Sequence, residues 1–254
     1  ERVGCSNIWR ITVTVYTNTI NTNVLFGGED DWLDFGDGNR MLIPEQPNVL
    51  RPDLGEGIAT ASYTATHVYS GNAKYTISYS EPNRNAGVVN MDGSVNTRFY
   101  IETQLIISPE LGCNNSPKLL VPPIDRACTG IAWFHNPGAY DPDGDSLSYE
   151  LVIPFRERNT TVVNYRSPDH QSFYSNYGSG NEGGTGPPIF MINAIDGTLT
   201  WDSPGRSGEY NIAFVIREWR MVAGIWRPIG FVRRDMQIIV DDCDNDRPEL
   251  DVPD

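Results

Sequence analysis

Several motifs that usually mark an enzyme are missing from this sequence. It contains no G-x-S-x-G nucleophile elbow, no H-E-x-x-H metal-binding motif and no phosphate-binding loop. The three histidines, His67, His135 and His170, are scattered over turn-like contexts. We therefore expect no catalysis. A hydrolase is kept as the weakest alternative only because a glycoside hydrolase needs no more than two suitably placed carboxylates.

Positive charge, long apolar runs and helical periodicity are also scarce. The chain carries 33 acidic against 19 basic residues, a net charge of −14, so nucleic acid would be repelled and is not an expected partner. No apolar run approaches the roughly 20 residues that a membrane span needs. Stretches rich in Thr, Val, Ile, Tyr, Gly, Pro and Asn instead indicate short strands joined by turns, and so an all-β protein.

The same sequence pattern, a strand-like run followed by Cys, Asn or Asp, and Pro, occurs twice in the chain. A strand-like run at 104–107 leads into Cys, Asn and Pro at 113–117, and a second run at 237–240 leads into Cys, Asp and Pro at 243–248. Two such endings predict two tandem modules, 1–112 and 113–246, with 247–254 as a linker to a following module. A tandem of small modules is more typical of a surface stalk or adhesin than of a catalytic protein.

The cysteines repeat with this pattern. None forms a C-x-x-C pair, which disfavours a zinc site. Cys5 and Cys128 each precede the first strand-like run of a module, whereas Cys113 and Cys243 each follow the last. We predict the disulfides Cys5–Cys113 and Cys128–Cys243 and an oxidising, extracellular setting. Four buried free thiols are the alternative.

The first module combines alternating strands with a distinctive turn. Residues 11–17 alternate apolar and polar side chains, which is typical of a half-buried strand. The run Asp-Phe-Gly-Asp-Gly at 34–38, followed by His67-x-Tyr69 and by Gly71-x-x-x-Tyr75, resembles a PKD domain, an immunoglobulin-like sandwich common in extracellular proteins. The resemblance implies that the aspartates and glycines shape a turn and that His67 is structural.

The second module contains a cluster of carboxylates around a glycine turn, at Asp141, Asp143 and Asp145. Such a cluster repels itself unless it is hydrated or neutralised by a cation, and calcium is the natural oxygen-seeking choice. An EF-hand is excluded because its sixth and twelfth positions would be Ser146 and Val152. We expect a junctional calcium site completed by Asn115 and Asp37; a solvated turn is the alternative.

This module and its tail also resemble a known family. Residues 139–151, 196–201 and 208–214 are similar to cadherin-like domains of bacterial surface proteins. The tail, Asp242-x-Asp244-Asn245-Asp246-x-Pro248, resembles the cadherin interdomain linker. The resemblance implies that Asp242, Asp244 and Asp246 are further calcium ligands once a following module is present. The fold expected for the whole chain is therefore two tandem immunoglobulin-like β-sandwiches, PKD-like and then cadherin-like.

The chain as a whole resembles secreted modular proteins of gliding Bacteroidetes, exported by the type IX system and associated with gliding motility. The segments that carry the resemblance are 81–85, 99–103, 114–117, 122–125, 135–137 and 218–220, together with the Asp141 turn. It implies a non-catalytic structural or adhesive segment on the bacterial cell surface, whose partners are neighbouring modules of the same long chain.

One long connection suggests an alternative function. Residues 156–188 hold Tyr165, Phe173, Tyr174 and Tyr177 among Ser, Asn and Gly. Rigid aromatics among small polar residues are typical of a binding surface, here for a surface glycan or a protein. The other reading is a surface loop folded over the sandwich and anchored by its aromatic side chains.

Overall fold

The computed structural model describes residues 1–19, 26–28 and 30–243. Its first half contains β1 (Ile8–Asn18), β2 (Trp32–Asp34), β3 (Arg40–Leu42), β4 (Val49–Leu50), β5 (Ile58–Val68), β6 (Lys74–Glu81), the short 3-10 helix η1 (Ser94–Asn96) and β7 (Phe99–Ile106). Its second half contains β8 (Lys118–Leu119), β9 (Ile124–Cys128), β10 (Trp133–His135), β11 (Ala139–Tyr140), β12 (Ser146–Val152), β13 (Phe155–Glu157), β14 (Thr160–Thr161), η2 (Gln171–Phe173), η3 (Tyr177–Ser179), β15 (Phe190–Ile192), β16 (Leu199–Trp201), β17 (Gly208–Val222) and β18 (Ile225–Asp241). The expected all-β class is confirmed.

The first half is a sandwich of two sheets. One sheet has the order β1-β5-β4, and the other contains β7, β6, β2 and β3. Ile11 and Val13 of β1 are buried while Thr12 and Thr14 are exposed, as the alternation in the sequence predicts. The buried side chains of both sheets form one core cluster drawn from residues 9–107.

The second half is also a sandwich. A small sheet of order β10-β16-β15 faces the long strands β12, β17 and β18. Trp201 of the small sheet packs edge-to-face on Tyr210 of β17, with ring centroids 4.9 Å apart, and both are fully buried. This second core cluster is drawn from residues 127–240. The two tandem immunoglobulin-like sandwiches expected from the sequence are therefore present.

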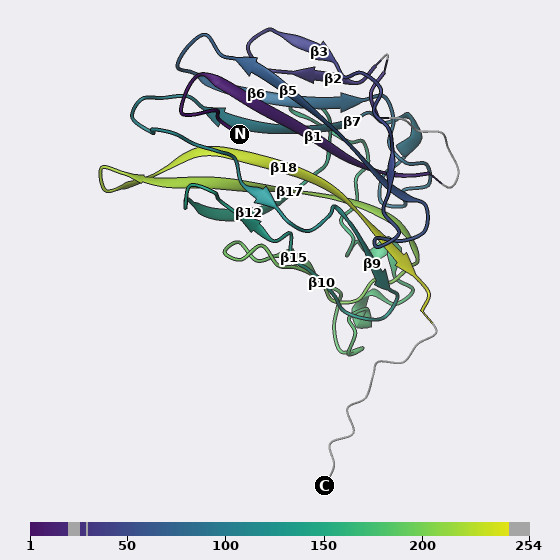
Figure 1. The fold of residues 1–254 in the computed structure, drawn as a ribbon. Helices are drawn as coiled ribbons and strands as arrows, with labels where there is room; N and C mark the ends of the chain where they lie inside the picture. The colour runs from purple at the N-terminus through teal and green to yellow at the C-terminus, as the bar shows by residue number, and fades with distance from the viewer. Residues whose placement is uncertain (20–25, 29, 244–254) are drawn as a thin grey trace.

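One ten-stranded sheet runs through both sandwiches. Its order is β12-β17-β18-β7-β6-β2-β3, with β9 beside β18 and with β13 and β14 continuing from β7. Where β18 of the second half pairs with β7 of the first, Gly230 and Val232 lie opposite Leu105 and Thr103. Figure 1 shows the long β17–β18 hairpin running beneath the strands of the first half. The boundary near residue 112 separates the two cores, but the sheet continues across it. That the two halves fold as separate domains stays a prediction from the sequence.

Both predicted disulfides are present. Cys5, before β1, is bonded to Cys113, after β7, with Cα atoms 5.1 Å apart. Cys128, at the end of β9, is bonded to Cys243, after β18, with Cα atoms 5.5 Å apart. Closing loops of this length removes unfolded-state entropy worth about 4–5 kcal/mol for each bond. Each disulfide joins the entry of a sandwich to its exit.

The turn between β2 and β3 has the structural role expected of it. His67 Nε2 lies 2.8 Å from Asp37 Oδ2, and the His67 ring stacks on Phe35 at 4.0 Å. Burial works against ionisation of Asp37, yet hydrogen bonds with His67 and Asn39 hold the pKa of this carboxyl below its usual value. Gly36 has a φ of +80°, and a Cβ there would lie 2.4 Å from the Thr76 carbonyl oxygen, so only glycine fits.

Candidate functional site

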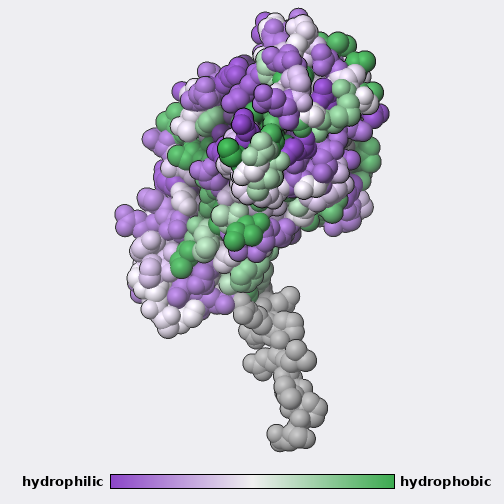
Figure 2. All heavy atoms as spheres, turned by 90° about the vertical axis from the view of Figure 1, so that its left-hand side faces the viewer, coloured by the Kyte–Doolittle hydropathy of each residue, from purple (hydrophilic) through white to green (hydrophobic). Residues whose placement is uncertain are grey.

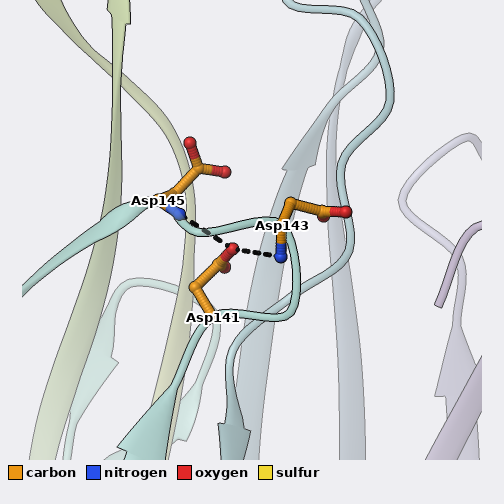
Figure 3. Close-up of side chains that lie close together, drawn as sticks. All are labelled: Asp141, Asp143 and Asp145. Carbon is orange, nitrogen blue, oxygen red and sulfur yellow. Dashed lines mark hydrogen bonds between the residues drawn. The ribbon is translucent and has the colours of Figure 1, made fainter.

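The three carboxylates of the second module come together in a tight turn between β11 and β12. Asp141 Oδ1 accepts hydrogen bonds from the backbone N–H groups of Asp143 (2.8 Å) and Asp145 (3.1 Å), as Figure 3 shows. One oxygen from each carboxylate lies within 4.8 Å of the others. The turn is therefore held by its first aspartate, in the manner of an Asx turn.

A guanidinium from β17 pairs with one of the three carboxylates. Arg220 forms a two-pronged ion pair with Asp145, with Nε 2.7 Å from Oδ1 and Nη2 against Oδ2. It also donates to the carbonyl oxygens of Cys113 (2.8 Å) and Leu111 and to Asn114 Oδ1 (2.9 Å). The bond to Asp145 raises the pKa of Arg220. One side chain thus ties the segment between the sandwiches to the acidic turn and to the long hairpin.

Asp143 and Asn115 make a second connection at the same place. Asp143 accepts from the Asn115 backbone N–H and from its side-chain Nδ2, the latter at 3.1 and 3.2 Å. Asn115 Oδ1 in turn accepts from the Arg2 backbone N–H at 2.8 Å. The N-terminal segment, the inter-module segment and the acidic turn therefore meet through Asn115.

The donor set fits calcium poorly as it stands. Asp141 Oδ2 is buried without a hydrogen-bond partner, and burial raises the pKa of Asp141. This is the only oxygen of the three carboxylates that is both buried and unpaired in the described structure. The carboxylates of Asp143 and Asp145 already have partners, in Asn115 and Arg220 respectively. A cation that needs six to eight oxygens would have to displace Arg220, so calcium here stays a prediction.

The other expected ligands lie elsewhere. Asp37 is bonded to His67 and is not part of the carboxylate cluster. Asp242 accepts from the hydroxyls of Thr129 (2.9 Å) and Ser207 (3.2 Å), next to the second disulfide. Asp244 and Asp246 lie outside the described residues.

A buried carboxyl lies beside the cluster, and sequence patterns did not single it out as a site. Glu218 of β17 is 1% exposed, and its Oε2 accepts from Asn114 Nδ2 at 3.1 Å. Burial, followed by the nearby carboxylates, raises its pKa to about 8. The strand across from it carries Gly230, where a Cβ would lie 2.2 Å from Glu218 Oε2. The glycine makes room for the Glu218 carboxyl where β18 pairs with β7.

The connection between β6 and β7, residues 82–98, reaches across to the second sandwich. Val89 N–H donates to the Glu209 carbonyl at 2.9 Å. The Asn90 side chain is fully buried and bonds both backbone groups of Asn211, with Oδ1 accepting at 2.9 Å and Nδ2 donating at 2.8 Å. We call this connection the arm. The arm lies alongside the first residues of β17, as a neighbouring strand would. The sequence of this segment predicts only turns.

Two side chains of the 156–188 connection are anchors. Phe173 is 3% exposed and packs edge-to-face on Tyr210 at 5.2 Å. The Tyr174 hydroxyl donates to the Ser203 carbonyl at 3.0 Å and accepts from Trp201 Nε1 at 2.9 Å. These contacts support the reading of a loop fastened over the sandwich, and they leave Phe173 unable to touch a ligand.

The remaining two aromatics of that connection differ from each other. Tyr165 packs against a small cluster that includes Met91 of the arm and Val162, and burial raises its pKa. Tyr177 is 40% exposed and stands edge-on to Tyr174. A ligand surface on this loop therefore depends on Tyr177 and stays a prediction.

Comparisons with known proteins yield little beyond the fold. No protein-family model and no curated protein matches the chain. The N-terminal Ig1-2 module of the Drosophila receptor protein tyrosine phosphatase DLAR is similar at 10% identity and a TM-score of 0.27, covering 91% of this chain and 90% of that one. Tandem Ig repeats of Dlar are similar at 9% identity and a TM-score of 0.27, covering 94% and 100%. Likeness this weak carries no argument about function.

Two further observations bear on class and setting. Among the described residues, no helix is long and apolar enough to cross a membrane. The two disulfides are compatible with an extracellular protein. Tandem immunoglobulin-like sandwiches fit a structural or adhesive module, and the contacts at their junction define what such a module can do mechanically.

Proposed function

We propose that this chain is a non-catalytic structural or adhesive segment of a longer extracellular protein, and that its two sandwiches act as one rigid spacer. The observation that carries the proposal is the shared sheet, in which β18 of the second sandwich is hydrogen-bonded to β7 of the first. Backbone pairing of this kind resists bending and sliding between the halves, because either motion breaks several hydrogen bonds together.

Other contacts between the halves support the same role. Arg84 of the arm and Asp235 of β18 form an ion pair at 2.7 Å in which both side chains are 1% exposed. Arg220 joins β17 to the segment between the sandwiches. The two sandwiches are thus in contact at three places: the arm, the pairing of β18 with β7, and the segment between the sandwiches. Bending between them would have to break contacts at all three.

The disulfides favour a segment that bears tension. A pull on the two ends passes from Cys5 to Cys113 through one disulfide, along residues 113–128, and from Cys128 to Cys243 through the other. Among the described strands, β8 and β9 lie on this covalent path, and all the others lie within the two disulfide loops. Tension therefore bypasses the strands within both disulfide loops, which suits a stalk that must keep its shape while it is pulled.

The finer reading follows the resemblances in the sequence. We propose a secreted protein of the bacterial cell surface, PKD-like and then cadherin-like, of the gliding-motility and type IX group, with neighbouring modules of the same chain as partners. The support is the PKD-like turn around Asp37 and His67, whose contacts suit a structural role, and the pair of disulfides.

Calcium at the acidic turn is part of the same proposal, in a limited form. Within the described residues, Asp141 Oδ2 is the only buried oxygen of the three carboxylates that lacks a hydrogen-bond partner, and Arg220 already supplies a positive charge beside it. We therefore expect calcium to add little to the unmodified junction. Calorimetry with calcium and then with EDTA tests this, and a large upward shift in melting temperature that disappears in Asp143→Ala would restore calcium as the stiffening element.

The test of the rigid spacer is equilibrium unfolding of the intact, oxidised chain. Because the halves share a sheet and buried polar contacts, we expect one cooperative transition, with equal calorimetric and van't Hoff enthalpies. Two separable transitions would show that the sandwiches unfold independently and would contradict the proposal.

A further inference from the structure

A groove lies on the outer face of the ten-stranded sheet, between the first sandwich and the β13–β14 turn. Trp32 of β2, Ser80 of β6 and Tyr100 of β7 lie opposite one another across the strands and form one row. Side chains paired in this way project to the same side of a sheet, and Leu33, one residue along, is buried in the core on the other side. The row is therefore the floor of the groove.

Arginines from both halves of the chain form the walls. Arg40 of β3 and Arg98, just before β7, come from the first half, while Arg156 and Arg158 come from β13 and the turn after it. The open groove between them has a volume of about 420 Å³. Because β13 pairs with β7 at Tyr100, the wall from the second half is fixed to the floor. The groove exists only when the two sandwiches are joined as they are here.

The charge of the groove is opposite to that of the protein. Four arginines line it against the carboxylates of Asp34 and Glu157, whereas the whole chain carries a net charge of −14. Within the part of the chain that the structure describes, Arg98, Arg156 and Arg158 have no salt-bridge partner. In an acidic protein, unpaired arginines gathered in one concavity favour an anionic ligand.

The kind of basic residue narrows the ligand. A guanidinium offers a planar fork of donors that matches a carboxylate or sulfate group with two hydrogen bonds. Arg40 lies over the Trp32 ring, with its Cζ 4.1 Å from the ring centroid, which limits its freedom before a ligand arrives. The floor adds the hydroxyls of Ser78 and Ser80, and each of these both donates and accepts.

We propose that this groove binds a short acidic oligosaccharide, with its carboxylate or sulfate groups on Arg98, Arg156 and Arg158 and its hydroxyls on Ser78 and Ser80. The volume is in the range of small-ligand sites. A densely charged polyanion such as a nucleic acid would be repelled by the chain's net charge of −14, so a ligand with sparse charges is favoured. This binding role goes beyond the spacer function, and it rests on the same joining of the two sandwiches.

Isothermal titration calorimetry with three matched tetrasaccharides tests the proposal: galacturonic acid, sulfated galactose and neutral galactose. We expect one or both acidic probes to bind, which identifies the anionic group, and the neutral probe not to bind. Affinity should fall as ionic strength rises. The double variant Arg156→Ala/Arg158→Ala should weaken binding by about tenfold or more, because each arginine contributes charged hydrogen bonds.

The control is Arg206→Ala, an exposed arginine outside the groove. It should bind the acidic probe as the unmodified chain does. Arg156 and Arg158 are themselves exposed, so their loss should leave the melting temperature unchanged, and unfolding cannot then explain weaker binding. Equal binding of neutral and acidic sugars, equal loss in the control, no binding of either acidic probe, or tighter binding of polyglutamate or single-stranded DNA would overturn the proposal.

Discussion

The ion pair between Arg84 and Asp235 provides the sharpest test of how the two sandwiches are joined. Arg84 Nη2 lies 2.7 Å from Asp235 Oδ2 and also donates to the Phe155 carbonyl at 2.9 Å. The guanidinium lies over the Phe99 ring, 5.0 Å from its centroid. Asp235 Oδ1 accepts from Asn211 Nδ2 at 3.1 Å. Within the described structure, removing Arg84 would leave this buried carboxylate with the Asn211 amide as its one side-chain hydrogen-bond partner and with the charge of Arg233 nearby.

We expect a large loss of unfolding free energy when one partner of the pair is replaced and a small loss when both are replaced. Breaking one side of a buried pair typically destabilises a protein by about 3–5 kcal/mol, whereas replacing both partners with apolar side chains is often close to neutral. Arg84 Nε and Nη1 also lack partners, so the pair itself is incompletely satisfied. We therefore expect Arg84→Met to lose about 3–5 kcal/mol and Arg84→Met/Asp235→Leu to recover most of that loss.

Urea denaturation of the four members of this double-mutant cycle measures the effect. The exposed pair between Arg10 and Glu1, 3.1 Å apart with both side chains about half exposed, is the matched control, and Arg10→Met should cost less than about 1 kcal/mol. If Arg84→Met costs no more than the control, or if the double variant is as unstable as the sum of the single variants, the reasoning about this junction is wrong.

Two other residues at the junction give further predictions. Glu218→Gln should flatten the pH dependence of stability: the pKa is raised to about 8 in the folded state, so unfolding free energy falls as pH rises from about 4.5 to about 8. Urea denaturation should show that the variant is more stable than the parent by about 1–3 kcal/mol at pH 8 and little changed at pH 5. Part of the pH dependence should remain in the variant, because the pKa of Glu81 is also raised to about 8. An equal dependence of unfolding free energy on pH in variant and parent would contradict this prediction. Arg220→Met should destabilise the protein, because it leaves the acidic turn uncompensated, and should make its melting temperature rise with added calcium more than that of the parent. An Arg220→Met protein that melts identically with calcium and with EDTA would show that the acidic turn does not hold this cation.

Local patterns in the sequence predicted the local structure well. The alternation in 11–17 identified β1, because one face of that strand is buried and the other is exposed. The paired positions of the four cysteines identified both disulfides, since each joins the first and last parts of a sandwich. The turn at Asp37 followed from its glycines, one of which leaves no room for a side chain.

Contacts between distant segments were not predictable in the same way. Arg220 is 75 residues from Asp145, and nothing near it in the sequence marks it as the ion-pair partner of that carboxylate. The arm reads as a turn region because Asn90 pairs with β17 through its side chain rather than through alternating strand positions. The groove needs arginines from β3, from the residue before β7 and from β13 and its following turn to meet on one face, which the shared sheet brings about.

Single-molecule force spectroscopy, with the chain held beyond both disulfides, tests the central claim most directly. In the oxidised protein, tension bypasses both disulfide loops, and we expect no release of the residues within them. After reduction, the 108 and 115 residues within the two disulfide loops would extend by about 370 and 390 Å. A rigid unit predicts their release together, in one step of about 760 Å. Two independent steps of about 370 and 390 Å would contradict the account.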